Sequence, residues 1–183
     1  DVCILNSSSF DVDVIVVIPV ESMRSLSVNE PPEGFVNTSS IAADGLWFPN
    51  GMVITPEGDM LVVAETFAHR LTTFDIAADG SLSNRRIFFE DSDMYPDGIC
   101  LDMEGAVWVA DPHNNEVVRV LEGGAIQDRI SLGDRGAYAC ALGGPDGRTL
   151  YICTNKGSGP ENAANRAGKI EFTKVAVPGV GSP

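Results

Sequence analysis

The stretch Leu46–Asp59, LWFPNGMVITPEGD, gives the first clue to the fold of this chain. It carries an Asn-Gly step at Asn50, then an apolar run, then a tight Pro-Glu-Gly turn. A similar stretch, MYPDGICLDMEGA, occupies Met94–Ala106 and has Asp97 in the place of Asn50. The two steps lie 47 residues apart, and in each copy a turn glycine follows the step's glycine by 7 residues. The chain therefore contains a repeat that begins with an oxygen-bearing side chain.

Length, charge and hydropathy limit the classes of protein to consider. The 183 residues suffice for one domain with a hydrophobic core, but not for two large domains. The formal net charge of −14 argues against nucleic acid and anionic membrane surfaces, whose phosphates attract the opposite sign. The longest apolar run, Val14–Val20, is too short for a membrane helix, and it follows acidic residues, unlike a signal peptide. No nucleic-acid or membrane partner is expected.

The cysteines show no metal-binding spacing, and the two histidines are not placed as a zinc pair. Cys100 and Cys153 lie in apolar runs, where free cysteine behaves as a small buried hydrophobic residue. Although sequence alone allows a disulfide, reduced thiols in a cytoplasmic setting are the expectation. The four cysteines are Cys3, Cys100, Cys140 and Cys153.

From residue 46 onward the chain consists of short apolar runs divided by glycine-bearing turns. Such a pattern predicts an all-β protein, and no segment shows helical periodicity over three turns. A repeat in the forties with about four strands per unit is typical of β-propeller blades. One such sheet cannot cover its own faces, so blades must stack around an axis. We predict three blades, at about 46–90, 91–133 and 137–177.

The remaining segments are less regular. Residues 1–45 form a poorly readable segment with a strand-like run at 10–20 and a turn at 30–34, a candidate remnant of a preceding blade. The polar insert 155–168 in the third blade is expected to be a mobile loop, and 178–183 is a C-terminal tail. The propeller interpretation also places four aromatic side chains between blades. They are Phe74, Phe88, Trp108 and Phe172.

Asn50 and Asp97 open the innermost strands of successive predicted blades, where side chains converge on a central channel. Carboxylate and carboxamide oxygens suit Ca²⁺, which takes about 6–8 ligands. Asp97 could also act as a general base toward water. The alternative is two plain turns, because Asn-Gly and Asp-Gly are strong hairpin signals. Each copy has a separate turn further on, so spacing alone leaves both interpretations open.

Several stretches resemble the C-terminal half of the SMP-30/gluconolactonase/luciferin-regenerating family. They include the Pro-Asn-Gly step, the Pro-Asp-Gly step and the run LGGPDGRTLYICT at residues 142–154. The resemblance implies a six-bladed propeller, of which about three to three and a half blades lie in this chain. It implies one axial divalent cation, Ca²⁺ first with Zn²⁺ or Mn²⁺ as alternatives, and hydrolysis of sugar lactones. It also implies that Asn50 and Asp97 bind the metal and that Asp97 is the catalytic base.

The resemblance covers only part of the family's site. Its other two metal ligands, a Glu and an Asn, and a substrate-binding Arg belong to the half of the propeller that this chain does not match. Three accounts follow: a piece of a longer protein, a half-length chain that completes the propeller as a homodimer, or an inactive relative that binds metal poorly and catalyses nothing. A metal-dependent lactonase is the leading hypothesis. A non-catalytic binding or scaffold propeller is the main alternative, and a hydrolase of phosphotriester-type substrates is a third.

Overall fold

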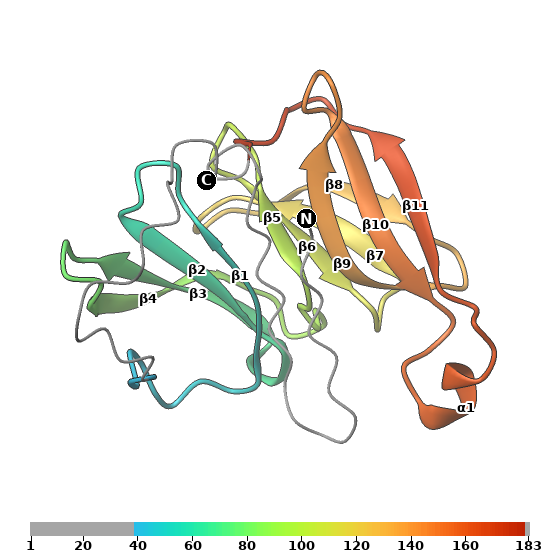
Figure 1. Ribbon diagram of the computed structural model, residues 1–183, viewed down its shortest axis with the longest axis horizontal. Helices are drawn as coiled ribbons and strands as arrows, with labels where there is room; N and C mark the ends of the chain where they lie inside the picture. The colour runs from blue at the N-terminus through green and yellow to red at the C-terminus, as the bar shows by residue number, and fades with distance from the viewer. Residues whose placement is uncertain (1–38, 182–183) are drawn as a thin grey trace, which may run out of the picture.

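The computed structural model describes residues 39–181 and consists almost entirely of antiparallel β-strands (Figure 1). The strands form three sheets, with orders β1-β2-β3-β4, β5-β6-β7-β8 and β11-β10-β9. The strand-like run at 10–20, the turn at 30–34 and Cys3 lie outside the described residues. The elements are β1 (Pro49–Ile54), β2 (Met60–Glu65), η2 (Thr66–Ala68), β3 (Arg70–Ile76), β4 (Leu82–Glu90), β5 (Ile99–Leu101), β6 (Val107–Asp111), β7 (Glu116–Val120), β8 (Ile126–Ser131), β9 (Gly136–Gly143), β10 (Thr149–Asn155), α1 (Pro160–Ala163) and β11 (Lys169–Lys174).

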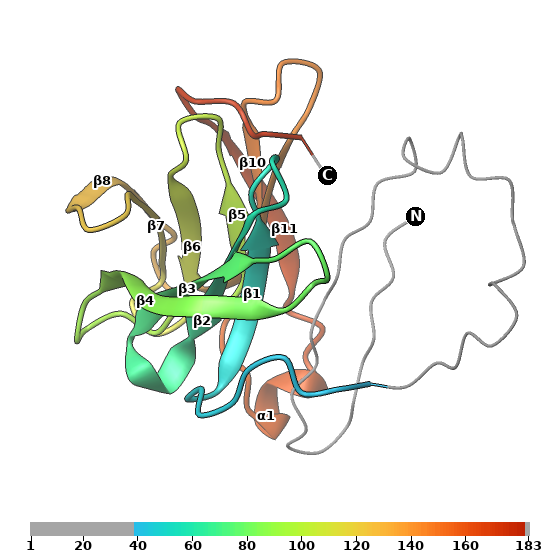
Figure 2. The same ribbon diagram turned by 90° about the vertical axis from the view of Figure 1, so that its left-hand side faces the viewer.

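The first strand of each sheet lies innermost. β1 contacts β5, and β5 contacts β9, so the three sheets meet along these strands. Figure 2 shows the sheet β1–β4 in front of the sheet β5–β8. This is how propeller blades stack around an axis, and it confirms the predicted all-β fold class.

The repeated turns take the same form in the first two sheets. Gly58 and Gly105 both have φ of 75°, a left-handed conformation that favours glycine. The amide of Gly58 donates to the carbonyl of Thr55 at 2.9 Å, and that of Gly105 donates to Asp102 at 3.0 Å. The glycine spacing in the sequence therefore marks equivalent β1–β2 and β5–β6 turns.

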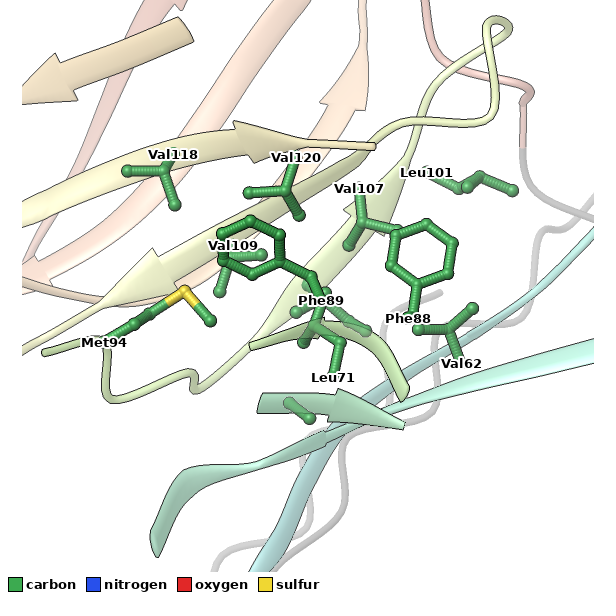
Figure 3. Packing of buried hydrophobic residues seen from close by; sticks show 12 residues of the cluster. Val62, Leu71, Phe88, Phe89, Met94, Leu101, Val107, Val109, Val118 and Val120 are labelled. Atoms are coloured by element: carbon green, nitrogen blue, oxygen red, sulfur yellow. The ribbon is translucent and has the colours of Figure 1, made fainter. Parts of the chain in front are cut away.

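The first hydrophobic core lies between the sheets β1–β4 and β5–β8 (Figure 3). β4 contributes Phe88 and Phe89, which face valines of β6 and β7 in the second sheet. On β6 the valines at 107 and 109 point toward this core, because alternate residues of a strand face opposite sides. Burying the Phe88 side chain alone stabilises the fold by about 2–3 kcal/mol.

The second core uses the other face of the same middle sheet. Trp108 and Ala110 of β6 pack with Leu150 and Ile152 of β10 in the third sheet. Every residue of β6 and β7 is buried, so the middle sheet is covered on both faces. The prediction that Phe88 and Trp108 pack between blades is confirmed.

The predictions for Phe74, Phe172 and Cys153 need correction. Phe74 is buried, but its pairing with Leu61 places it on the face of its sheet turned away from the second sheet. Phe172 is 71% exposed rather than packed between blades, because it lies on β11 at the outer face of the third sheet. Cys153 is exposed on that same face and is not a buried hydrophobic residue.

The polar insert 155–168 contains the short helix α1, which was not predicted (Figure 1). Pro160 stands in its first turn, where a missing amide proton is tolerated, and Glu161 complements the positive end of the helix dipole. Four residues are too few to leave a periodic signal in the sequence. None of the helices between residues 39 and 181 could cross a membrane.

Candidate metal and catalytic site

The structure brings Asn50 and Asp97 together across the first two sheets. Asn50 is the second residue of β1, and Asp97 immediately precedes the Gly98–Ile99 entry into β5. The amide of Gly51 donates a 3.1 Å hydrogen bond to the carbonyl oxygen of Asp97. A Cβ atom at position 51 would lie 2.6 Å from that oxygen, so only glycine fits. The Gly of the Asn-Gly step thus serves close strand approach rather than chain reversal.

A short chain of hydrogen bonds orients Asn50. Its Nδ2 atom donates to Thr66 Oγ1 at 3.4 Å, and Thr66 Oγ1 donates to the carbonyl of Pro96 at 2.7 Å. Because the amide nitrogen faces Thr66, the amide oxygen of Asn50 points in a different direction. That oxygen is the atom that a hard cation would bind.

Asp97 has a strongly shifted proton affinity. Burial raises the pKa of its carboxyl group to about 7, and the nearby charge of Asp111 adds to the increase. Hydrogen bonds from the Asn50 side chain and the Gly98 amide oppose the shift by stabilising the carboxylate. Near neutral pH the metal-free carboxyl group therefore exists in both its protonated and its ionised form, and the ionised form can accept a proton.

Two buried carboxylates support the segments that lead into these residues. Glu65, at the end of β2, accepts a 2.7 Å hydrogen bond from the amide of Trp47. Asp111, at the end of β6, accepts a 3.1 Å bond from the amide of Tyr95. Each acid thus anchors the loop that precedes Asn50 or Asp97. Both strands end in an Ala-acid pair, Ala64-Glu65 and Ala110-Asp111, but the sequence alone does not show which backbone groups these acids bind.

Glu65 is held more firmly than its position at a strand end suggests. Its side chain is fully buried, and it accepts bonds from Arg70 Nε at 2.9 Å and from Thr72 Oγ1 at 2.5 Å. The Arg85 guanidinium lies 3.3 Å away on the same oxygen. Buried charge is tolerated only when paired in this way. Glu65 is therefore a structural anion and not a spare ligand.

Asn50 and Asp97 match a hard cation in ligand type. Carboxamide and carboxylate oxygens are ligands that Ca²⁺ prefers. Between residues 39 and 181, no group of three or more His, Cys, Asp or Glu side chains is placed to hold a metal ion. Two side chains supply fewer than the roughly 6–8 oxygens that Ca²⁺ takes. Asn50 and Asp97 alone would therefore not complete a Ca²⁺ site.

Comparison with known families identifies the repeat. Residues 33–156 match the family described as SMP-30/Gluconolactonase/LRE-like region. The chain belongs to this family. The match spans both the Pro-Asn-Gly and the Pro-Asp-Gly steps, so the resemblance seen in the sequence is confirmed.

Curated members of the SMP-30/gluconolactonase/LRE-like family include sugar lactonases. The chain is 29% identical over 151 residues to the 6-deoxy-6-sulfogluconolactonase of Pseudomonas putida, covering 79% of this chain and 52% of that protein. It is 29% identical over 154 residues to pentonolactonase XacC of Haloferax volcanii, covering 78% and 52%. It is 27% identical over 139 residues to regucalcin of Oryctolagus cuniculus, covering 72% and 46%. The chain spans about half the length of these relatives.

Solved structures of the family share the fold. A luciferin-regenerating enzyme superposes with a TM-score of 0.63 at 22% identity, covering 73% of this chain and 47% of that one. The calcium-binding protein regucalcin from Agrobacterium tumefaciens gives a TM-score of 0.62 at 22% identity, covering 74% and 48%. This family member is therefore about half of an SMP-30/gluconolactonase-type propeller, as predicted.

Proposed function

We propose that the protein is a divalent-metal-dependent hydrolase that opens sugar lactones. The observation that carries the proposal is the placement of Asn50 and Asp97 beside each other at the starts of neighbouring innermost strands, where the Gly51 amide donates to the Asp97 carbonyl. Support comes from membership of a family that contains a sulfogluconolactonase and a pentonolactonase. Calcium is the preferred cation, since a relative is described as calcium-binding; Zn²⁺ and Mn²⁺ are alternatives.

In this proposal Asp97 accepts the proton of the attacking water. Burial raises the pKa of the metal-free carboxyl group to about 7, which suits a general base at neutral pH. Hydrogen bonding by Asn50 and the Gly98 amide acts in the opposite direction and lowers the pKa of Asp97, which favours its carboxylate form. A cation bound beside these oxygens would supply electrostatic polarisation of the lactone carbonyl, and it would also lower the pKa of Asp97.

A pH-stat assay on several aldonolactones, with and without Ca²⁺, Zn²⁺ or Mn²⁺, tests the proposal. Lactone opening releases a proton, so turnover appears directly as base consumption. Asp97→Asn keeps the shape of the side chain and removes the base, and we expect it to lower kcat by about 100-fold or more. Asp59→Asn, at an exposed turn, is the matched control and keeps full activity. Absence of metal-dependent turnover in the unaltered protein contradicts the proposal.

The proposal requires a second half of the propeller. Both ends of the three-sheet stack carry exposed apolar side chains: Met52, Ile54 and Ile87 on the first sheet, and Ile170 and Phe172 on the third. Faces of this kind invite a partner. A second copy completing the propeller as a homodimer is the form we propose for the isolated chain. Light scattering tests it: a monomeric mass excludes the homodimer.

A cytoplasmic, reducing setting is part of the same proposal. Cys100, Cys140 and Cys153 are free thiols, which suits such a compartment. Alkylation of the protein purified from its native cell, followed by mass spectrometry, tests this point. A disulfide between any two of these cysteines contradicts it.

A non-catalytic binding propeller is the second candidate. It is favoured by the small number of donors, because within residues 39–181 no group of three or more His, Cys, Asp or Glu side chains is placed to hold a metal ion. Metal analysis of protein purified without chelator separates the two candidates. Stoichiometric divalent metal supports the hydrolase, and its absence supports the binding module.

A further inference from the structure

The axial position occupied by Asn50 and Asp97 has a third member, at the start of the third sheet. The amide of Gly51 donates to the carbonyl of Asp97 at 3.1 Å. One sheet further on, the amide of Gly98 donates to the carbonyl of Tyr138 at 3.0 Å. The same bond thus links the first sheet to the second and the second to the third. By this register Tyr138 is the equivalent of Asn50 and Asp97.

The close approach of the backbones gives the same equivalence. A Cβ atom on Gly51 would lie 2.8 Å from the Cα of Gly98. A Cβ atom on Gly98 would lie 2.7 Å from the Cα of Ala139. Gly51, Gly98 and Ala139 therefore lie against one another from sheet to sheet. Asn50 precedes the first of them, Asp97 the second and Tyr138 the third.

The strand geometry at Tyr138 also resembles that at Asn50. The pairing of β1 with β2 shifts register between Pro49 and Met52, around Asn50. In the pairing of β9 with β10, Cys153 lies opposite Ala139 and Thr154 lies opposite Ala137. Tyr138 therefore has no partner on β10 and is the extra residue of a bulge. Bulges of this kind redirect a side chain and are common beside active sites. Tyr138 is thus displaced from the regular alternation of β9.

Tyr138 lines an open cavity of about 360 Å³ with Thr154, Asn155 and Lys169. Cys153 and Ile170 also line it, so it lies on the face of the third sheet turned away from the second. Neither Asn50 nor Asp97 lines this cavity. Tyr138 is half-buried, borders this polar-edged cavity, and accepts through its carbonyl the hydrogen bond from Gly98, the residue that follows Asp97.

We propose that Tyr138 is a substrate-binding residue of the lactone site, whose phenol contacts the hydroxyl groups of a sugar lactone held at Asp97. This inference rests on the proposed function and extends it to substrate selection. A phenol both donates and accepts a hydrogen bond, which matches a sugar hydroxyl. Its ring offers an apolar surface to the sugar's C–H groups. A site that hydrogen-bonds a substrate hydroxyl discriminates strongly against analogues that lack it.

Fluorine NMR of protein labelled with 3-fluorotyrosine tests the position of this residue. The chain has three tyrosines, so three resonances are expected, and Tyr→Phe variants assign them. The probe is a gluconolactam, which keeps the ring and the hydroxyl groups of the lactone but resists hydrolysis. We expect saturating lactam to shift the Tyr138 resonance and to leave that of Tyr151, on β10, in place. No shift at Tyr138 overturns the inference.

Affinity measurements separate this inference from the proposed catalysis. We expect Tyr138→Phe to weaken lactam binding about tenfold, the loss of one hydrogen bond, while the affinity for Ca²⁺ stays unchanged. Tyr151→Phe is the matched control and alters neither. Lactam binding that depends on Tyr138 in a protein without turnover supports the inference and contradicts the hydrolase. Turnover with equal KM in Tyr138→Phe supports the hydrolase and overturns the inference.

Discussion

The amide of Gly51 donates a 3.1 Å hydrogen bond to the carbonyl oxygen of Asp97, and this bond joins the first two sheets at the candidate site. The contact leaves no space for a side chain at position 51. A Cβ atom there would lie 2.6 Å from the Asp97 oxygen and 2.7 Å from the Ile99 nitrogen. Both atoms belong to the backbone, which cannot move aside as a flexible side chain can.

Gly51→Ala is therefore expected to destabilise the protein by about 1–3 kcal/mol, the usual effect of overpacking. It should also displace Asp97 and weaken divalent-cation binding. Urea unfolding and a calcium titration measure the two effects. Gly168→Ala is the matched control, because its nearest neighbour would lie 4.0 Å from the new Cβ atom. An unfolding midpoint of Gly51→Ala equal to that of the control contradicts the prediction.

Glu65→Gln tests the buried carboxylate that anchors the segment before Asn50. The substitution removes the charge that pairs with Arg70 and Arg85, while the side chain keeps its size. We expect a loss of about 2 kcal/mol, the contribution typical of hydrogen bonds to a charged group. Glu122→Gln is the control, since Glu122 is 50% exposed and its ion pair with Arg86 lies at the surface. Surface pairs contribute about 1 kcal/mol at most.

The same carboxylate predicts the acid sensitivity of the fold. Burial alone would raise the pKa of Glu65, but hydrogen bonds from Arg70, Thr72 and the Trp47 amide outweigh it and lower the pKa below its usual 4.5. A carboxyl group whose pKa is lowered in the folded state stabilises the protein fully at pH values above its unfolded pKa. This stabilisation is lost as the pH falls through the folded pKa. The free energy of unfolding should therefore decline as pH drops below about 4.5. Glu65→Gln should show a shallower decline, and equal slopes contradict the assignment.

Local sequence signals predicted the parts of the fold that depend on local geometry. The glycines at 58 and 105 need a left-handed conformation, so their spacing revealed the equivalent turns. The equivalent positions of Asn50 and Asp97 in two successive repeats could likewise be predicted from the repeat spacing in the sequence. Exposure of Phe172 could not be predicted, because an apolar strand is buried only if another sheet covers it. The covering sheet is a tertiary property that strand periodicity does not contain.

Tyr138 shows a second limit of sequence reasoning. The third repeat has no Asn-Gly or Asp-Gly step at the start of its first strand, because its Asp146-Gly147 step lies in the turn before β10. A one-residue bulge also shifts the register of β9 against β10. A fixed repeat spacing therefore points past the equivalent residue. The roles of Glu65 and Asp111 had a visible signal, the Ala-acid strand ends, but their partners Trp47 and Tyr95 are 18 and 16 residues away. Only the folded backbone brings them together.

The thiols of Cys100 and Cys140 give a prediction about reactivity. Cys100 donates a hydrogen bond to Cys140, with the sulfur atoms 3.6 Å apart between the second and third sheets. This bond and burial raise the pKa of the Cys100 thiol well above its usual value. Because the thiolate is the nucleophile, alkylation of Cys100 should be slow in the folded protein.

A short iodoacetamide pulse followed by peptide mass spectrometry measures this reactivity. Cys153, which is exposed on β10, serves as the internal reference. We expect Cys100 to react at least about tenfold more slowly than Cys153 in the folded protein, since both thiolate fraction and access are reduced. In concentrated urea the two rates should converge, because the hydrogen bond and the packing between the sheets are lost. Equal rates in the folded protein would show that β5 and β9 separate readily, and would contradict a closely packed junction beside Asp97.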